Sequence, residues 1–113
     1  MNVKELSEKF NLHVAAGGNH LDRQILGGYC GDLLSDVMAN APDGSIWLTV
    51  QTHQNIVAVA VLHEMAAIVL TGGQEPDQET IEKAEEDGIP ILMWPQTAFE
   101  LAGQIHAVVV TNT

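Results

Sequence analysis

The feature that most constrains the fold is a regular alternation of short β-rich runs with helix-like segments from residue 45 onward. Apolar runs at residues 45–50, 67–70 and 89–93 are each followed by a turn signal and then by a segment with helical character. Strands that alternate with helices in this way are typical of a parallel sheet with helices on both faces. We therefore predict an α/β fold.

The first forty residues predict four further elements. Residues 3–10 have apolar side chains at the spacing of one helix face, and residues 12–16 and 25–30 are candidate strands. Asp32 is expected to cap a helix that carries an apolar stripe over residues 33–38. A turn at residues 40–44 then leads into the alternating part of the chain.

The segment at residues 55–65 is ambiguous, because its valines alternate as in a strand while its alanines suit a helix. We assign a helix, since this preserves the regular βαβ order. The helix is apolar nearly all round, so either the sheet and another layer or a partner subunit must cover it. Two more helices are predicted, at residues 76–87 with Gly88 after the last turn, and at residues 96–107. Residues 108–110 are interpreted as an edge strand or a surface for a partner.

The length of 113 residues fits one domain, which we assign to residues 1–113. Cys30 is the single cysteine, so no disulfide can form within the chain. The first ten residues are too polar for a signal peptide, and no apolar run approaches the ~20 residues of a membrane span. We expect a cytoplasmic protein that does not enter a membrane.

The net charge of −11 repels phosphate backbones and anionic membranes. We therefore do not expect the protein to bind nucleic acid. Arg23 is the single arginine, beside three lysines, so an anionic ligand would need Arg23, backbone amides or a metal ion.

The sequence has none of the common catalytic motifs. There is no GxxxxGK[ST] phosphate loop, no GxGxxG dinucleotide fingerprint and no GxSxG nucleophile elbow. The five histidines form no HxxxH or HExxH pair that would place two imidazoles on one helix face. We predict no catalytic residue and no metal site, and we assign no cofactor.

A candidate ligand site follows from position instead. In an open parallel sheet, ligands bind beyond the carboxyl ends of the strands, where loops and helix amino termini converge. Polar segments follow the predicted strands there, at residues 51–55, 71–73 and 94–97. The candidate ligand-binding residues are Gln51, Thr52, His53, Asn55, Thr71, Gly72 and Gly73, together with Arg23. Free backbone amides at Asn55 and Ile56 could receive an anion. The alternative is that these residues only cap a helix and form turns, and that Arg23 only supports a loop.

Several of these segments also carry a family resemblance. Asp22-Arg23 and Thr71-Gly72-Gly73 together spell the five letters for which the DRTGG domain family is named. The runs at residues 31–38, 52–60 and 75–77 are similar to that family too. The resemblance spans essentially the whole chain.

The resemblance implies a three-layer α/β/α fold with a mainly parallel sheet, and a regulatory or assembly role without a reaction of its own. Domains of this family are found beside CBS pairs in regulated pyrophosphatases, in some phosphotransacetylases and as stand-alone proteins. The amino-terminal domain of HPr kinase has a related fold. A distant similarity to CBS pairs suggests an adenine nucleotide as ligand.

We therefore expect a non-enzymatic regulatory, ligand-sensing or assembly module that forms a homodimer, binds a nucleotide-like small molecule and acts through a partner enzyme. The homodimer is expected because hydrophobic residues make up 46% of so short a chain. The alternative is a small metabolic enzyme or accessory subunit with a cleft around His53 at the strand ends. A position of His53 beside Arg23 would favour this alternative.

Overall fold

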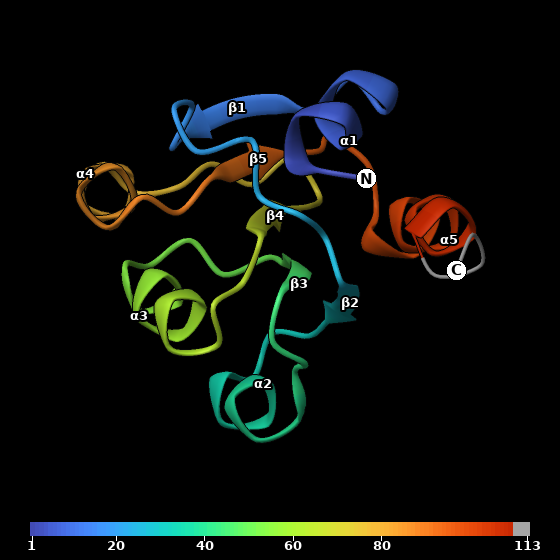
Figure 1. Cartoon of the computed structure of the whole chain (residues 1–113). Coiled ribbons are helices and arrows are strands. Elements are labelled where there is room, and N and C mark those ends of the chain that lie inside the picture. Colours follow the sequence, from blue (N-terminus) through green and yellow to red (C-terminus); the bar gives the residue numbers. More distant parts are fainter. Residues whose placement is uncertain (110–113) are drawn as a thin grey trace.

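The computed structural model describes residues 1–109 and shows a five-stranded sheet between two layers of helices (Figure 1). The elements in chain order are α1 (Val3–Lys9), β1 (His13–Ala16), β2 (Gly27–Cys30), α2 (Leu34–Asn40), β3 (Ser45–Thr49), α3 (Asn55–Leu62), β4 (Ala67–Leu70), α4 (Gln78–Asp87), β5 (Ile91–Met93) and α5 (Ala98–Val109). The predicted α/β fold is confirmed.

The strand order is β1-β5-β4-β3-β2. Strands β2 to β5 run parallel, whereas β1 pairs with β5 in the antiparallel direction, with His13 opposite Met93. The sheet is therefore mainly parallel, as expected. We call the end at which β2 to β5 finish the carboxyl edge of the sheet, and the opposite end the amino edge.

Two apolar layers enclose the sheet because side chains alternate along each strand. In β3, Trp47 packs with α2, α3 and α4 on one face, whereas Ile46 and Leu48 pack with α1 and α5 on the other. Figure 1 shows the same division, with α2, α3 and α4 on one side of the strands and α1 and α5 on the other. The indole of Trp47 is fully buried, and its Nε1 donates to the Gly31 carbonyl at 2.9 Å.

Local sequence signals explain several element ends. A capping box begins α1, where the Asn2 side chain accepts from the Glu5 amide and the Glu5 carboxylate accepts from the Asn2 amide. Helix α4 ends at Gly88, which has a φ of 71°. This left-handed conformation costs glycine little, so the predicted helix stop is confirmed.

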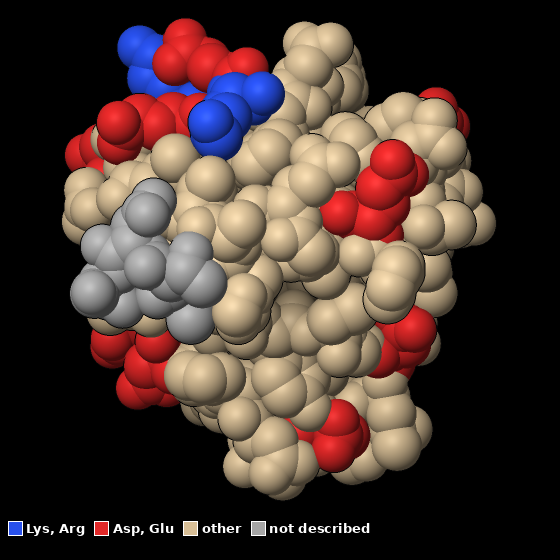
Figure 2. Space-filling view, turned by 90° about the vertical axis from the view of Figure 1, so that its right-hand side faces the viewer, with Lys and Arg blue, Asp and Glu red and all other residues tan. Residues whose placement is uncertain are grey.

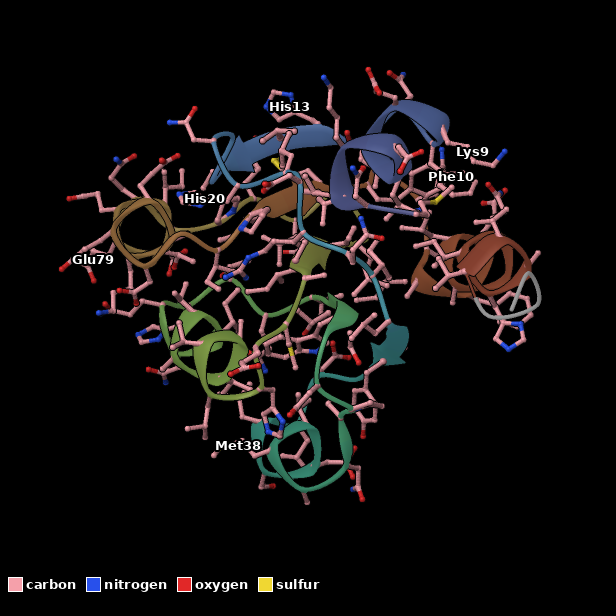
Figure 3. The ribbon with its side chains drawn as sticks, viewed as in Figure 1. Lys9, Phe10, His13, His20, Met38 and Glu79 are labelled. Atoms are coloured by element: carbon pink, nitrogen blue, oxygen red, sulfur yellow. The ribbon has the colours of Figure 1, made fainter. Side chains whose placement is uncertain are left out.

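The prediction for Asp32 is wrong. Helix α2 has Leu33 at its amino-terminal cap position, without a side-chain hydrogen bond. The Asp32 carboxylate instead accepts from the Thr49 hydroxyl at 2.8 Å and from the Val50 amide at 2.9 Å. Two residues of the expected apolar stripe are exposed, Leu33 and Met38 (Met38 is labelled in Figure 3), and Leu34 is half-buried. Only Val37 of α2 is buried.

The ambiguous segment forms a helix, but α3 ends at Leu62, three residues earlier than predicted. Its buried residues are Ile56, Val57, Val59 and Ala60. The protein's own sheet and neighbouring helices cover this side. Val61 and Leu62 remain exposed, Leu62 by 65%. Most of the apolar surface of this helix therefore needs no partner subunit.

The last helix is longer at its end than predicted. Helix α5 begins at Ala98 and continues through Val109, so Val108 and Val109 do not form the edge strand that was one alternative. Residue 110, the last of that predicted tail, lies outside the described residues. Within residues 1–109, no helix combines the length and the apolar character needed to cross a membrane.

Candidate functional site

All the candidate ligand residues except Arg23 lie at the carboxyl edge of the sheet. Residues 51–55 follow β3, residues 71–73 follow β4 and residues 94–97 follow β5. Because β3, β4 and β5 are neighbours and parallel, their connecting loops lie side by side. The structure therefore brings these segments together, as the sequence predicted.

The loop between β3 and α3 is tied to the start of α4. The Thr52 carbonyl accepts from the Asp77 amide at 3.2 Å and from the Thr80 hydroxyl at 2.6 Å. Thr80 is fully buried, so its hydroxyl is a fixed donor. On the surface, Gln54 Nε2 donates to the Glu79 carboxylate at 3.3 Å (Glu79 is labelled in Figure 3). Movement of this loop would therefore shift the first turn of α4.

The amino end of α3 differs from the expectation. His53 is exposed, and its Nδ1 accepts from the Asn55 amide at 3.2 Å. The Ile56 amide donates to the His53 carbonyl at 3.1 Å. The prediction that these amides are free to receive an anion is therefore wrong, because residues of the same loop occupy them. The imidazole Nε2 of His53 is the end of the ring directed away from this local bond.

The two glycines after β4 tie that loop to the next one. Gly72 has a φ of 68° and Gly73 a φ of 74°, a conformation that other residues adopt only with strain. The Gly72 amide donates to the Gln96 carbonyl at 2.6 Å and the Gly73 amide to the Trp94 carbonyl at 3.2 Å. Thr71, just before them, is buried. The glycines thus join the loop after β4 to the loop before α5.

Asp32 belongs to this edge, although the sequence did not single it out as a site residue. Its backbone carbonyl accepts from Gln51 Nε2 at 2.9 Å, and its carboxylate holds Thr49 and Val50 at the end of β3. Asp32 therefore orients the Gln51 side chain. No local pattern identifies this role, because its partners are 17 to 19 residues away in sequence.

Arg23 lies at the amino edge of the sheet, away from the other candidates. It precedes β2, and its Nη1 donates at 2.7 Å to the carbonyl of Met65, just before β4. Arg23 lines an open hollow there together with Glu64, Ala66 and Asp87. It supports a loop carbonyl, which was the structural alternative. Arg23 therefore does not lie beside His53, the arrangement that would have favoured the enzyme alternative.

Within residues 1–109, two side chains have raised pKa values, which favour their protonated forms. Burial, followed by the nearby Asp32 carboxylate, raises the pKa of the Cys30 thiol above its ordinary value. A hydrogen bond to Asp36 is the main cause that raises the pKa of the Tyr29 phenol. Neither shift produces a nucleophile or a general base at neutral pH. Within residues 1–109, no group of three or more His, Cys, Asp or Glu side chains is arranged to hold a metal ion.

The sequence model of the DRTGG domain family matches residues 30–108. The match contains the segments after β3, β4 and β5, with Thr71, Gly72 and Gly73 among them. Asp22 and Arg23 precede the matched residues. No curated protein shows a significant sequence match to this chain.

A solved structure with a similar fold is that of the CBS and DRTGG domains of the regulatory region of Clostridium perfringens pyrophosphatase, complexed with the activator diadenosine tetraphosphate. The TM-score is 0.67 and the sequence identity is 16%, over 91% of the present chain. The present chain spans 45% of the length of that structure. At this identity the likeness establishes the shared fold.

Proposed function

Because the chain belongs to the DRTGG domain family, we propose that residues 1–113 form one non-enzymatic regulatory domain. In this proposal the domain binds a nucleotide-like small molecule at the carboxyl edge and transmits its presence to a partner enzyme. The solved neighbour supports the choice of ligand class, since that regulatory region was complexed with a nucleotide activator.

The observation that carries the proposal is the chain of hydrogen bonds between the loops at this edge. Thr52 is bonded to Asp77 and Thr80, and Gly72 is bonded to Gln96. A ligand that moves one loop must stretch these bonds or move the loops bonded to it. The starts of α4 and α5 would then shift with it, which gives a partner a surface that depends on ligand binding.

The side chains at this edge suit the neutral parts of a nucleotide better than its phosphates. Gln51, Thr52, His53 and Asn55 offer amide, hydroxyl and imidazole groups that can hydrogen-bond a base or a ribose. Residues 51–55, 71–73 and 94–97 contain no lysine or arginine, and Glu75 and Asp77 lie next to them in sequence. We therefore expect phosphate groups to require Mg²⁺ or a basic side chain of the partner.

Thermal unfolding in the presence of nucleotides tests the proposal. AMP, ATP and diadenosine tetraphosphate are added in turn, each with and without Mg²⁺. A ligand at one hundred times its dissociation constant contributes ~2.7 kcal/mol. For a domain of this size that raises Tm by about 10 °C. The proposal fails if none of these nucleotides raises Tm under either condition.

Paired variants locate the binding. His53→Ala and Gln51→Ala should weaken the nucleotide-dependent rise in Tm, because each removes a side chain at the carboxyl edge. Arg23→Ala is the control at the amino edge. It should lower Tm of the free protein, because the bond to the Met65 carbonyl is lost, and leave the nucleotide-dependent rise unchanged. An Arg23→Ala protein of normal stability that no longer binds nucleotide would place the site elsewhere.

A further inference from the structure

The outer side of helix α5 carries an apolar stripe, which lies beside the exposed side chains of Glu100, Gln104 and His106. Leu101 and Ile105 are buried against the sheet. On the other side, Phe99, Gly103 and Ala107 follow one another at intervals of four residues and are exposed. Residues four apart lie on the same side of a helix. Phe99 is 90% exposed, the largest value among the large hydrophobic side chains of residues 1–109.

The surface beside α5 is apolar too. A groove of about 150 Å³ runs between α5 and β2, and its walls include Gly28, Cys30, Ala102 and Val109. Strand β2 is the last strand of the sheet on this side, and among the described residues it pairs with β3 alone. We call the outer face of α5, this groove and β2 the α5–β2 face.

Charge is sparse on this face although the chain carries a net charge of −11. Glu100 is the single Lys, Arg, Asp or Glu within the bounds of α5 and β2, whereas α4 alone contains Glu79, Glu82, Lys83, Glu85, Glu86 and Asp87. Figure 2 looks onto the α5 side and shows basic side chains gathered at the top, over α1. Below them the middle of this face is largely uncharged, and acidic side chains lie around its margins.

We propose that the α5–β2 face is the interface of a two-fold homodimer, in which α5 packs antiparallel against α5 of a second copy with Gly103 at the axis. The spacing makes the face complementary to itself. Residues 99 and 107 are equally distant from residue 103, so Phe99 of each copy lies over Ala107 of the other. Gly103 has no Cβ, which lets the two helices approach closely.

The second copy is favoured over another occupant by charge and by area. Two molecules of charge −11 repel one another least where their facing surfaces carry few charges, so the α5–β2 face suits contact between two copies. A stable interface needs about 800 Å² from each partner, which is about one seventh of the 5832 Å² surface of this chain. Helix α5 alone is only about 18 Å long. The contact therefore extends across the groove to β2.

Light scattering on the purified chain tests the proposal. At tens of micromolar the mass should be twice 12.2 kDa. Phe99→Asp should raise the dissociation constant at least about 30-fold, as the loss of a large aromatic side chain buried at a protein interface does. Leu62→Asp, on the exposed side of α3, is the matched control and should leave the dimer intact. A mass of 12.2 kDa for the unaltered chain, or a dimer that only Leu62→Asp dissociates, would overturn the proposal.

The Gly103→Leu variant distinguishes an effect on dimerisation from an effect on folding. A Cβ at Gly103 meets nothing within 4 Å in the monomer, so the isolated domain accommodates a side chain there. Leucine also has a higher helix propensity than glycine. The Gly103→Leu protein should therefore keep or raise its Tm at dilution while losing the dimer. Added NaCl should strengthen the unaltered dimer by screening the net charge. A Gly103→Leu protein that remains dimeric, or a dimer that salt weakens, would contradict this interface.

Discussion

Gly17→Ala should be among the most destabilising single-methyl additions in this chain. Gly17 lies in the turn after β1 with a φ of 72°, and its amide donates to the Glu85 carboxylate at 2.9 Å. A Cβ there would lie 2.6 Å from the Ile89 carbonyl oxygen and 2.6 Å from Pro90 Cα. Both neighbours are backbone atoms just before β5, so they cannot move without disturbing the strand.

The magnitude follows from two contributions. A side chain in the left-handed conformation costs ~1–2 kcal/mol. Forcing a methyl group into closely packed backbone costs a further ~1–3 kcal/mol. Gly72→Ala is the control, because Gly72 has a φ of 68° but nothing lies within 4 Å of its Cβ position. Gly72→Ala should therefore show only the cost of a side chain in the left-handed conformation.

Urea denaturation at equilibrium measures both variants. We expect Gly17→Ala to lower the free energy of unfolding by about 3–4 kcal/mol and Gly72→Ala by about 1 kcal/mol, with unchanged m values. Equal losses for the two variants would refute the reasoning, because only Gly17 has the backbone contact. Since the Gly72→Ala protein should fold, its nucleotide-dependent rise in Tm also shows whether nucleotide binding needs the loop conformation after β4.

Two other predictions follow from single contacts. Thr80→Val keeps the shape of a fully buried side chain but removes the hydroxyl that donates to the Thr52 carbonyl. It should therefore lower the free energy of unfolding by about 1–2 kcal/mol. A change below about 0.3 kcal/mol in urea denaturation would show that this bond does not hold the loop. Because the pKa of Cys30 is raised, iodoacetamide should alkylate it more slowly at pH 8 than it alkylates a cysteine in a short peptide. The pH at which the alkylation rate increases should also be higher for Cys30 than for the peptide. The contribution of this pKa shift to stability is present at neutral pH and is lost as the pH rises through the pKa of Cys30 in the folded protein. Equal alkylation rates for Cys30 and the peptide at pH 8 would contradict the raised pKa.

The order of the elements could be predicted because the signals are local. The bounds of β4 agree with the predicted strand at residues 67–70, since an apolar run there is followed directly by Thr71 and two glycines. The stop of α4 at Gly88 follows from one residue in a left-handed conformation. The end of α5 was missed because the β-branched Val108 and Val109 disfavour a helix locally. Packing of Val109 against the core outweighs that preference.

The candidate site could be predicted in its outline only. That residues 51–55 and 71–73 share an edge follows from the parallel order of β3 and β4. The position of Arg23 does not follow, because its partner Met65 is 42 residues away in sequence. The role of Asp32 was likewise hidden, since a carboxylate before a helix is a common cap and its contact with Thr49 exists only in the folded sheet.

The most direct test of ligand binding at the carboxyl edge is a titration followed residue by residue. Diadenosine tetraphosphate with Mg²⁺ is added to the uniformly ¹⁵N-labelled chain, and the backbone amide shifts are recorded by NMR. We predict that the largest changes fall in residues 51–55 and 71–73, with smaller ones at Asp77, Thr80 and Gln96 through the hydrogen bonds that join these loops. No saturable change, or changes gathered around Arg23 at the amino edge, would contradict the proposed site.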